Sequence, residues 1–180
     1  MNKLFSLLAL AALSAPAAAE DNYAFYGSIG AGAYRVRDAG FDDVAPMANL
    51  LGGYSFNNYV AVEGAYTRFF ESSERAQGIK LGIDGNVWDL STKLSYPVTN
   101  RFSPYARLGW SYLDLNAVLT DGDTRLRTNG YDDAFNWAVG SGFRLTNRLE
   151  LNGEYSKIMV KDGDLDRMAL NLNYRFGSRQ

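Results

Sequence analysis

The stretch Met168-Ala-Leu-Asn-Leu-Asn-Tyr-Arg-Phe176 alternates large apolar side chains with small or polar ones without a break. Successive side chains of a β-strand point to opposite faces of its sheet, so this stretch predicts a strand with one greasy and one polar face. The apolar face consists of Met168, Leu170, Leu172, Tyr174 and Phe176, and the other of Ala169, Asn171, Asn173 and Arg175. Such a pattern is typical of a strand that crosses a membrane.

Working outward, alternating runs bounded by turn-forming residues predict eight strands in all. The first two predicted strands are rich in Gly and Ala, so alternation does not show which of their side chains face the inside of the barrel. The predicted strands are roughly Tyr23–Arg37, Pro46–Phe56, Tyr59–Phe70, Ile79–Tyr96, Phe102–Leu115, Ala134–Leu145, Leu149–Met159 and Arg167–Phe176.

The connections between these runs alternate in length. Phe56–Asn58, Pro97–Arg101 and Thr146–Arg148 are short enough for tight turns. The other connections are richer in Asp, Gly, Ser, Asn and Arg, which suits solvated loops. These predicted loops are Arg37–Ala45, Glu71–Gly78, Asp114–Asp133 and Val160–Asp166. Short turns at one end and long loops at the other predict an up-and-down barrel.

Alternation leaves open which face of the barrel is outside. A soluble periplasmic barrel would turn its apolar face inward around a ligand, and this remains an alternative. We favour the membrane, because the polar face is mostly Gly, Ala and Ser with few charges, unlike a soluble exterior. Aromatic residues near strand ends predict two interfacial girdles: Tyr59, Tyr96 and Phe176 at the turn end, Phe69, Tyr112 and Phe135 at the loop end. The predicted fold class is therefore all-β, an eight-stranded antiparallel up-and-down transmembrane β-barrel.

The N-terminus predicts export. Lys3, the apolar run Leu4–Leu13 and the small residues Ala17–Ala19 form the pattern of a cleaved signal peptide over residues 1–19, which leaves a barrel domain over 20–180. Removing Lys3 would leave one basic residue fewer than the 18 of the full chain, against 20 acidic ones. This negative balance argues against nucleic-acid binding, and the chain has no cysteine for disulfides. The expected location is the cell outer membrane.

Charged residues of both signs fall on the predicted inner face. A narrow lumen would force each of them to find an opposite partner. These residues are Glu63, Lys93, Arg107, Arg144, Glu150, Glu154 and Arg175. We interpret them as a salt-bridge network that fills the barrel, with a narrow ion-conducting channel as the alternative.

The sequence does not favour catalysis or a cofactor. It contains no histidine and no cysteine, which excludes Ser-His-Asp and Cys-His catalysis and zinc sites built from these residues. Glu150 and Glu154 share a face and leave a paired-carboxylate hydrolase formally open. The segment from Asp162 begins like a calcium loop but has Arg167 and Asn173 where Gly and Glu belong, so it predicts no metal site, and neither does Asp121-Gly-Asp123. Gly27, Gly30 and Gly32 are not followed by a helix and predict no nucleotide loop.

Four stretches resemble the eight-stranded OmpA-like transmembrane domain and the wider bacterial outer-membrane barrels that include OmpX and Ail. They are Asn58-Tyr-Val-Ala-Val-Glu63-Gly-Ala-Tyr66, Leu90-Ser-Thr-Lys93-Leu-Ser-Tyr96-Pro97-Val-Thr, Pro104-Tyr-Ala-Arg107-Leu-Gly109 and Leu151-Asn-Gly-Glu154-Tyr155. The resemblance implies that Glu63 and Lys93 belong to an interior gate network. The family's interior Arg on the seventh strand is Asn152 here, which leaves Arg107 and Arg144 as candidate substitutes.

The resemblance also implies a non-enzymatic role in surface structure, membrane integrity, adhesion or host interaction. The loops Asp114–Asp133 and Glu71–Gly78 are the candidates for binding an external ligand. Further expected partners are outer-membrane lipids, including lipopolysaccharide, and the barrel-assembly machinery. Leu172, Tyr174 and Phe176 form the expected C-terminal assembly signal. No peptidoglycan-binding domain is expected after the barrel.

Overall fold

The computed structural model describes residues 24–37, 44–70, 74–76, 79–121, 124–160 and 163–176, with side chains described in 25–35, 44–70, 85–114, 131–160 and 164–176. The predicted signal peptide lies outside these ranges. No described helix is long and apolar enough to cross a bilayer. The described strands are β1 (Ala24–Arg37), β2 (Val44–Ser55), β3 (Val60–Phe69), β4 (Glu74–Ala76), β5 (Ile79–Ser95), β6 (Phe102–Asp121), β7 (Thr124–Arg144), β8 (Leu149–Val160) and β9 (Gly163–Arg175).

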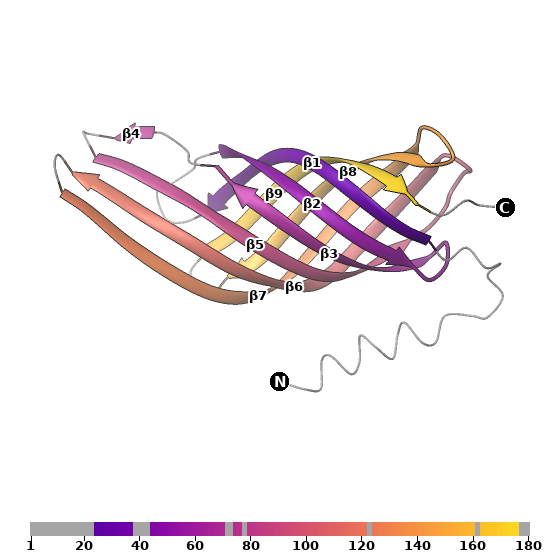
Figure 1. Cartoon of the computed structure of the whole chain (residues 1–180), viewed down its shortest axis with the longest axis horizontal. Coiled ribbons are helices and arrows are strands. Elements are labelled where there is room, and N and C mark those ends of the chain that lie inside the picture. The colour runs from indigo at the N-terminus through magenta and orange to yellow at the C-terminus, as the bar shows by residue number, and fades with distance from the viewer. Residues whose placement is uncertain are drawn as a thin grey trace.

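Eight of these strands close into one antiparallel barrel. The hydrogen-bonded order runs β3-β2-β1-β9-β8-β7-β6-β5, and β5 pairs back onto β3. The closing registers place Tyr26 opposite Arg175 between β1 and β9, and Val60 opposite Leu94 between β3 and β5. The short β4 lies outside the ring and pairs with the outer end of β5 (Figure 1). The predicted eight-stranded barrel is confirmed.

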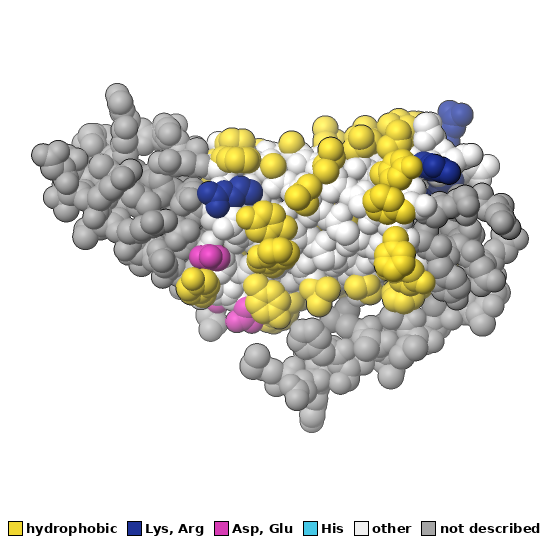
Figure 2. Space-filling model, viewed as in Figure 1, with side chains coloured by type: hydrophobic (Ala, Val, Ile, Leu, Met, Phe, Trp, Pro, Cys, Tyr) yellow, Lys and Arg dark blue, Asp and Glu magenta, His cyan; other side chains and the backbone are white. Residues whose placement is uncertain are grey.

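Alternation sorts the side chains as the sequence predicts for the last six barrel strands. On β5, for example, Val87 is fully buried while its neighbour Trp88 is 61% exposed. The structure also settles the two strands that the sequence leaves unphased. Tyr26 and Tyr34 of β1 point inward, as do Ala45 and Met47 of β2, whereas Phe25, Ile29 and Leu50 lie outside. On the face that Figure 2 shows, most hydrophobic side chains gather in two bands toward the two ends of the barrel, with uncharged polar side chains and backbone between them.

The three tight turns share one local device. A side-chain oxygen at the start of the turn accepts hydrogen bonds from the backbone N–H groups two and three residues later. Asn57 Oδ1 accepts from Tyr59 and Val60 at 2.7 and 2.8 Å. Thr99 and Thr146 hydroxyls do the same in the other two turns. These side chains explain why such short segments can reverse the chain.

At the opposite end, three predicted loops are wrong in their extent. The predicted loop Asp114–Asp133 is mostly a hairpin, because β6 continues to Asp121 and β7 starts at Thr124. Likewise most of Val160–Asp166 is strand, because β8 continues to Val160 and β9 starts at Gly163, and Glu71–Gly78 contains β4. Strands that project into water need no apolar face to remain paired, so their composition resembles that of loops. Composition therefore did not predict where these strands end.

The loop end of the lumen is apolar, which corrects the prediction of a polar interior throughout. Every barrel strand contributes at least one buried side chain to this region, which we call the apolar layer. Its members are Tyr34, Ala45, Met47, Phe69, Val87, Leu113, Ala134, Ile158 and Leu165. Phe69, predicted to be a girdle residue, belongs to it and is 1% exposed. The prediction failed because Phe69 is in phase with the inward-facing Glu63, six residues earlier.

We predict that Phe69→Ala lowers the free energy of unfolding by about 3 to 5 kcal/mol, because it leaves a cavity in a packed layer. Its neighbour provides a matched control, since Phe70 is 47% exposed and its removal empties no cavity. Urea unfolding of both variants in lipid vesicles checks this. Equal losses for Phe69→Ala and Phe70→Ala would contradict the apolar layer.

Candidate functional site

Four charged side chains from four strands meet in the middle of the lumen, and we call them the central ion layer: Glu63, Lys93, Arg107 and Glu154. Arg107 Nη1 lies 2.9 Å from Glu63 Oε2, and Lys93 Nζ lies 3.8 Å from Glu63 Oε1. Arg107 Nη2 also pairs with Glu154 Oε1. Two cations and two carboxylates thus balance, and all four are sheltered from water.

Two tyrosines complete this layer. The Tyr26 hydroxyl donates to Glu63, and the Tyr105 hydroxyl donates to Glu154 Oε2 at 3.0 Å. Lys93 Nζ lies 4.1 Å from the centroid of the Tyr105 ring, close enough for a cation–π contact. Each carboxylate therefore has several donors, as a buried charge requires.

Glycine makes room for both tyrosine rings. A Cβ built on Gly53 would lie 2.4 Å from Cζ of Tyr26, and one on Gly140 would lie 2.6 Å from Cζ of Tyr105. The rings therefore lie across the neighbouring strands at positions where a side chain would exclude them. These glycines have a steric reason to occur on the inner face.

A second charged cluster, which was not predicted from the sequence, lies between the central ion layer and the apolar layer. Arg167 Nη1 lies 2.9 Å from Asp89 Oδ2, and its Nε donates to Ser156 Oγ at 3.0 Å. Asp89 Oδ1 accepts from the Ser111 hydroxyl at 2.5 Å and from Asn136 at 3.2 Å. Strand alternation could have revealed this cluster, because it places Asp89 on the same inner face as Lys93, and Arg167 on the same inner face as Arg175.

The remaining predicted lumen charges lie at the turn end of the barrel. Arg175 Nη2 is 3.5 Å from Glu150 Oε2. Arg144 donates to the backbone carbonyl of Asn100 at 2.9 Å and does not reach Glu63. Of the two candidate substitutes for the interior Arg that Asn152 replaces, the structure therefore pairs Arg107 with Glu63. The seven predicted residues form two separate groups rather than one network.

The other predicted positions are on the outer face or outside the described side chains. Tyr59, Tyr96, Tyr112 and Phe176 are exposed, and Phe135 is half-buried beside the Trp110 ring. Their girdle role stays a prediction, as does the assembly role of Leu172, Tyr174 and Phe176. Asp164 pairs with Lys157, and Asp166 accepts from the Tyr155 hydroxyl. No cluster of the described residues could hold a metal ion.

We predict that Glu63→Gln costs about 3 to 5 kcal/mol of stability, because Arg107 and Lys93 then share one remaining carboxylate in a buried site. Glu150→Gln is the matched control. It removes a longer ion pair whose Arg175 side chain is 29% exposed, so its cost should be clearly smaller. Urea unfolding in vesicles measures both. A larger loss for Glu150→Gln would contradict the ranking of the two groups.

Comparisons with known proteins place this geometry in context. Ail, the attachment invasion locus protein of Yersinia pestis, in complex with the heparin analogue sucrose octasulfate, is similar with a TM-score of 0.65 and 18% identity, over 86% of this chain and 99% of Ail. Neisserial surface protein A (NspA) is similar with a TM-score of 0.67 and 14% identity, over 84% and 97% of the two chains. The N-terminal barrel of Pseudomonas aeruginosa OprF gives 0.60 and 15%, over 84% and 97%.

At these identities the structural likeness shows a shared fold. Comparison with curated protein sequences gave no match. The family model described as outer membrane protein beta-barrel domain, however, matches residues 5–176. Because this match spans nearly the whole sequence, the chain belongs to the outer-membrane β-barrel family and is a protein of the cell outer membrane.

Proposed function

We propose that this protein is a closed, non-enzymatic surface scaffold that binds a host or cell-surface protein through a sheet projecting beyond the barrel. The observation that carries the proposal is the unequal length of the strands. β6 and β7 have 20 and 21 residues, whereas β3 has 10 and β8 has 12. About ten residues suffice to cross a bilayer, so the two long strands continue well past it. Figure 1 shows β5, β6 and β7 extending past the other barrel strands at one end.

The outer parts of β5, β6 and β7 form what we call the projecting sheet, and this sheet has an unpaired edge. β7 pairs with β8 from Phe135 onward, so Thr124–Ala134 is bonded on one side to β6 and to no other described strand. The opposite side of the sheet differs, because β4 pairs with the outer part of β5. A free edge offers a row of backbone donors and acceptors to an incoming strand. This supports a protein as the partner.

Ail shares the fold of this chain and was crystallised with a heparin analogue. This supports a surface role for a barrel of this fold. The same class of ligand is less suited to this chain. Asp132 and Asp133 are exposed at the base of the projecting sheet and would repel a polyanion. We therefore propose a protein partner, and we keep lipopolysaccharide and the assembly machinery as further expected partners.

The interior argues against the alternative of an ion channel. An ion on the barrel axis would have to break the central ion layer and then cross the apolar layer, which offers it no compensating charge. The second alternative, a periplasmic barrel with a ligand inside, conflicts with the outward-facing apolar side chains and with the outer-membrane family. A lack of histidine and cysteine further supports a non-enzymatic role.

We predict no discrete conductance in planar bilayers for the wild type or for Lys93→Ala. Removing Lys93 disturbs the central ion layer but leaves the apolar layer intact, so the lumen should stay closed. Single-channel recording with purified protein measures this, with a known porin as the positive control. Discrete openings in either protein would support the channel instead.

The projecting sheet can be shortened without disturbing the barrel. Asn116 and Asn129 are cross-strand partners, so residues 117–128 can be replaced by Asn-Gly, which closes a two-residue hairpin. We predict that bacteria displaying this variant lose attachment to epithelial cell monolayers, while its heat-modifiable migration on electrophoresis is retained. Asn58→Gly, in a tight turn at the opposite end of the barrel, is the control. Unchanged attachment of the shortened variant, at equal surface display, would contradict the proposed function.

A further inference from the structure

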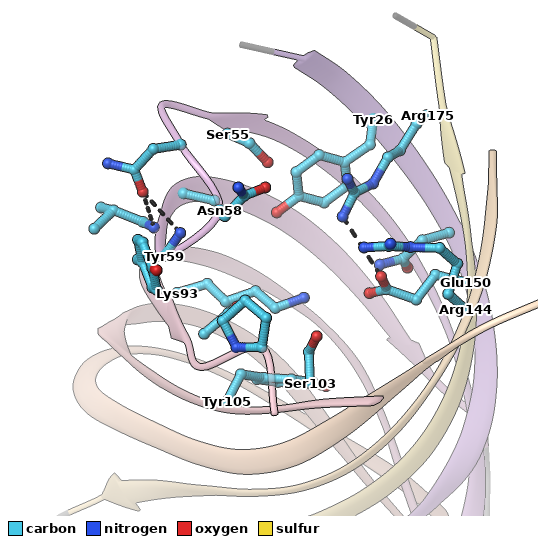
Figure 3. Close-up of a pocket in the computed structure, with 16 residues that line it drawn as sticks. Tyr26, Ser55, Asn58, Tyr59, Lys93, Ser103, Tyr105, Arg144, Glu150 and Arg175 are labelled. Atoms are coloured by element: carbon cyan, nitrogen blue, oxygen red, sulfur yellow. Dashed lines mark hydrogen bonds and ion pairs between the residues drawn. The ribbon is translucent and has the colours of Figure 1, made fainter. Parts of the chain in front are cut away.

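The turn end of the barrel contains a polar pocket that the proposed surface function does not use. Its lining comes from two of the tight turns, Phe56–Asn58 and Pro97–Arg101, and from all eight barrel strands, and its cavity volume is about 50 Å³. This is enough for several waters or a small ion. Figure 3 shows Arg144, Glu150 and Arg175 on one side of the pocket, with Lys93 and Tyr59 on the other. We call this pocket the vestibule.

The vestibule holds the excess charge of the lumen. Among the described side chains that face inward, five are cationic and four are carboxylates. The central ion layer is balanced, and so is the pair of Arg167 with Asp89. Two arginines and Glu150 are left at the mouth. The surplus positive charge is therefore located in the vestibule.

The two arginines of the vestibule are poorly used as donors. A guanidinium has five N–H groups, yet to the described residues the Arg144 side chain makes one hydrogen bond, to the neutral carbonyl of Asn100 at 2.9 Å. Arg175 reaches Glu150 at 3.5 Å, the limit for a hydrogen bond. No carboxylate of the described residues lies within ion-pair distance of Arg144. By contrast, Arg107 in the central ion layer uses both terminal nitrogens on carboxylates.

We propose that the vestibule binds an oxyanion of the phosphate class between Arg144 and Arg175. Guanidinium groups bind phosphate through paired N–H donors, and an anion between them would relieve their mutual repulsion. The serine hydroxyls of Ser55 and Ser103 line the same pocket and offer neutral donors. Both termini of the barrel and all three tight turns lie at this end, so the pocket opens toward the periplasm. The phosphate can be a free ion or the headgroup of a phospholipid in the inner leaflet.

Glu150 acts as a built-in competitor in this arrangement. Its carboxylate is directed toward Arg175, and Gly142 on the neighbouring β7 has no side chain to displace it: a Cβ there would lie 2.7 Å from Glu150 Oε1. An oxyanion must therefore share Arg175 with Glu150. Removing the charge of Glu150 should strengthen binding, which a purely structural role for the three residues would not produce.

The test is a titration of the protein with inorganic phosphate, in dodecyl maltoside micelles, which contain no phosphate, at constant ionic strength. The readout is the NMR signal of the arginine Nε–H groups. We expect a saturable response in the wild type, weakened about tenfold by Arg144→Gln or Arg175→Gln and strengthened several-fold by Glu150→Gln. Arg148→Gln is the matched control, because Arg148 is exposed at the same end and contacts Tyr174 on the outer face.

Heat-modifiable migration verifies that each variant folds, and Glu150→Gln keeps the test valid if an arginine variant does not. Nanodiscs with phosphatidylglycerol distinguish the two sources: loss of the phosphate response there identifies the headgroup as the occupant, and an unchanged response identifies the free ion. No saturable response in the wild type, equal affinity in Arg144→Gln and Arg148→Gln, or no gain in Glu150→Gln would each overturn the proposal.

Discussion

Closure of the backbone hydrogen bonds is the constraint on which the rest of the structure depends. Lipid offers no partners to N–H and C=O groups, so a membrane-crossing sheet must have no open edge within the bilayer. Here the pairing of β3 with β5 joins the two ends of the strand order and so removes both edges. Above the bilayer water replaces lipid, the constraint disappears, and β7 can keep an unpaired edge. The same physical rule thus accounts for the sealed part of the barrel and for the projecting sheet.

Closure with only eight strands leaves a narrow interior, and this decides what the inner side chains must be. Charges there cannot remain hydrated, so they occur as balanced groups, with Arg107 between Glu63 and Glu154 and Arg167 on Asp89. Nearer the loop end the same space is filled by Phe69, Ile158 and other apolar residues. Among the described lumen residues, charge is left unbalanced only at the turn end. The layers therefore follow the access of water along the barrel axis.

Sequence reasoning predicted the features that depend on local periodicity. Alternation gave the barrel strands, their number and the inward direction of Glu63 and Lys93, because a period of two fixes the face of each residue. It failed where the partner is set by distance across the lumen: Asp89 and Arg167 are 78 residues apart, and no local pattern links them. It also failed for Phe69, which was assigned from its place near a strand end instead of its phase. Strand ends in water were missed because an exposed hairpin and a loop have similar composition.

Successive side chains of each barrel strand alternate between the acyl chains outside and the sealed lumen inside. Paramagnetic relaxation from spin labels on the acyl chains, measured by NMR on the protein in nanodiscs, tests this alternation most directly. We expect strong relaxation of Leu170 and Leu172, whose side chains lie outside, and protection of Val87 and Ile158, which are fully buried. Equal relaxation of both sets, or protection of Leu170 and Leu172, would contradict it.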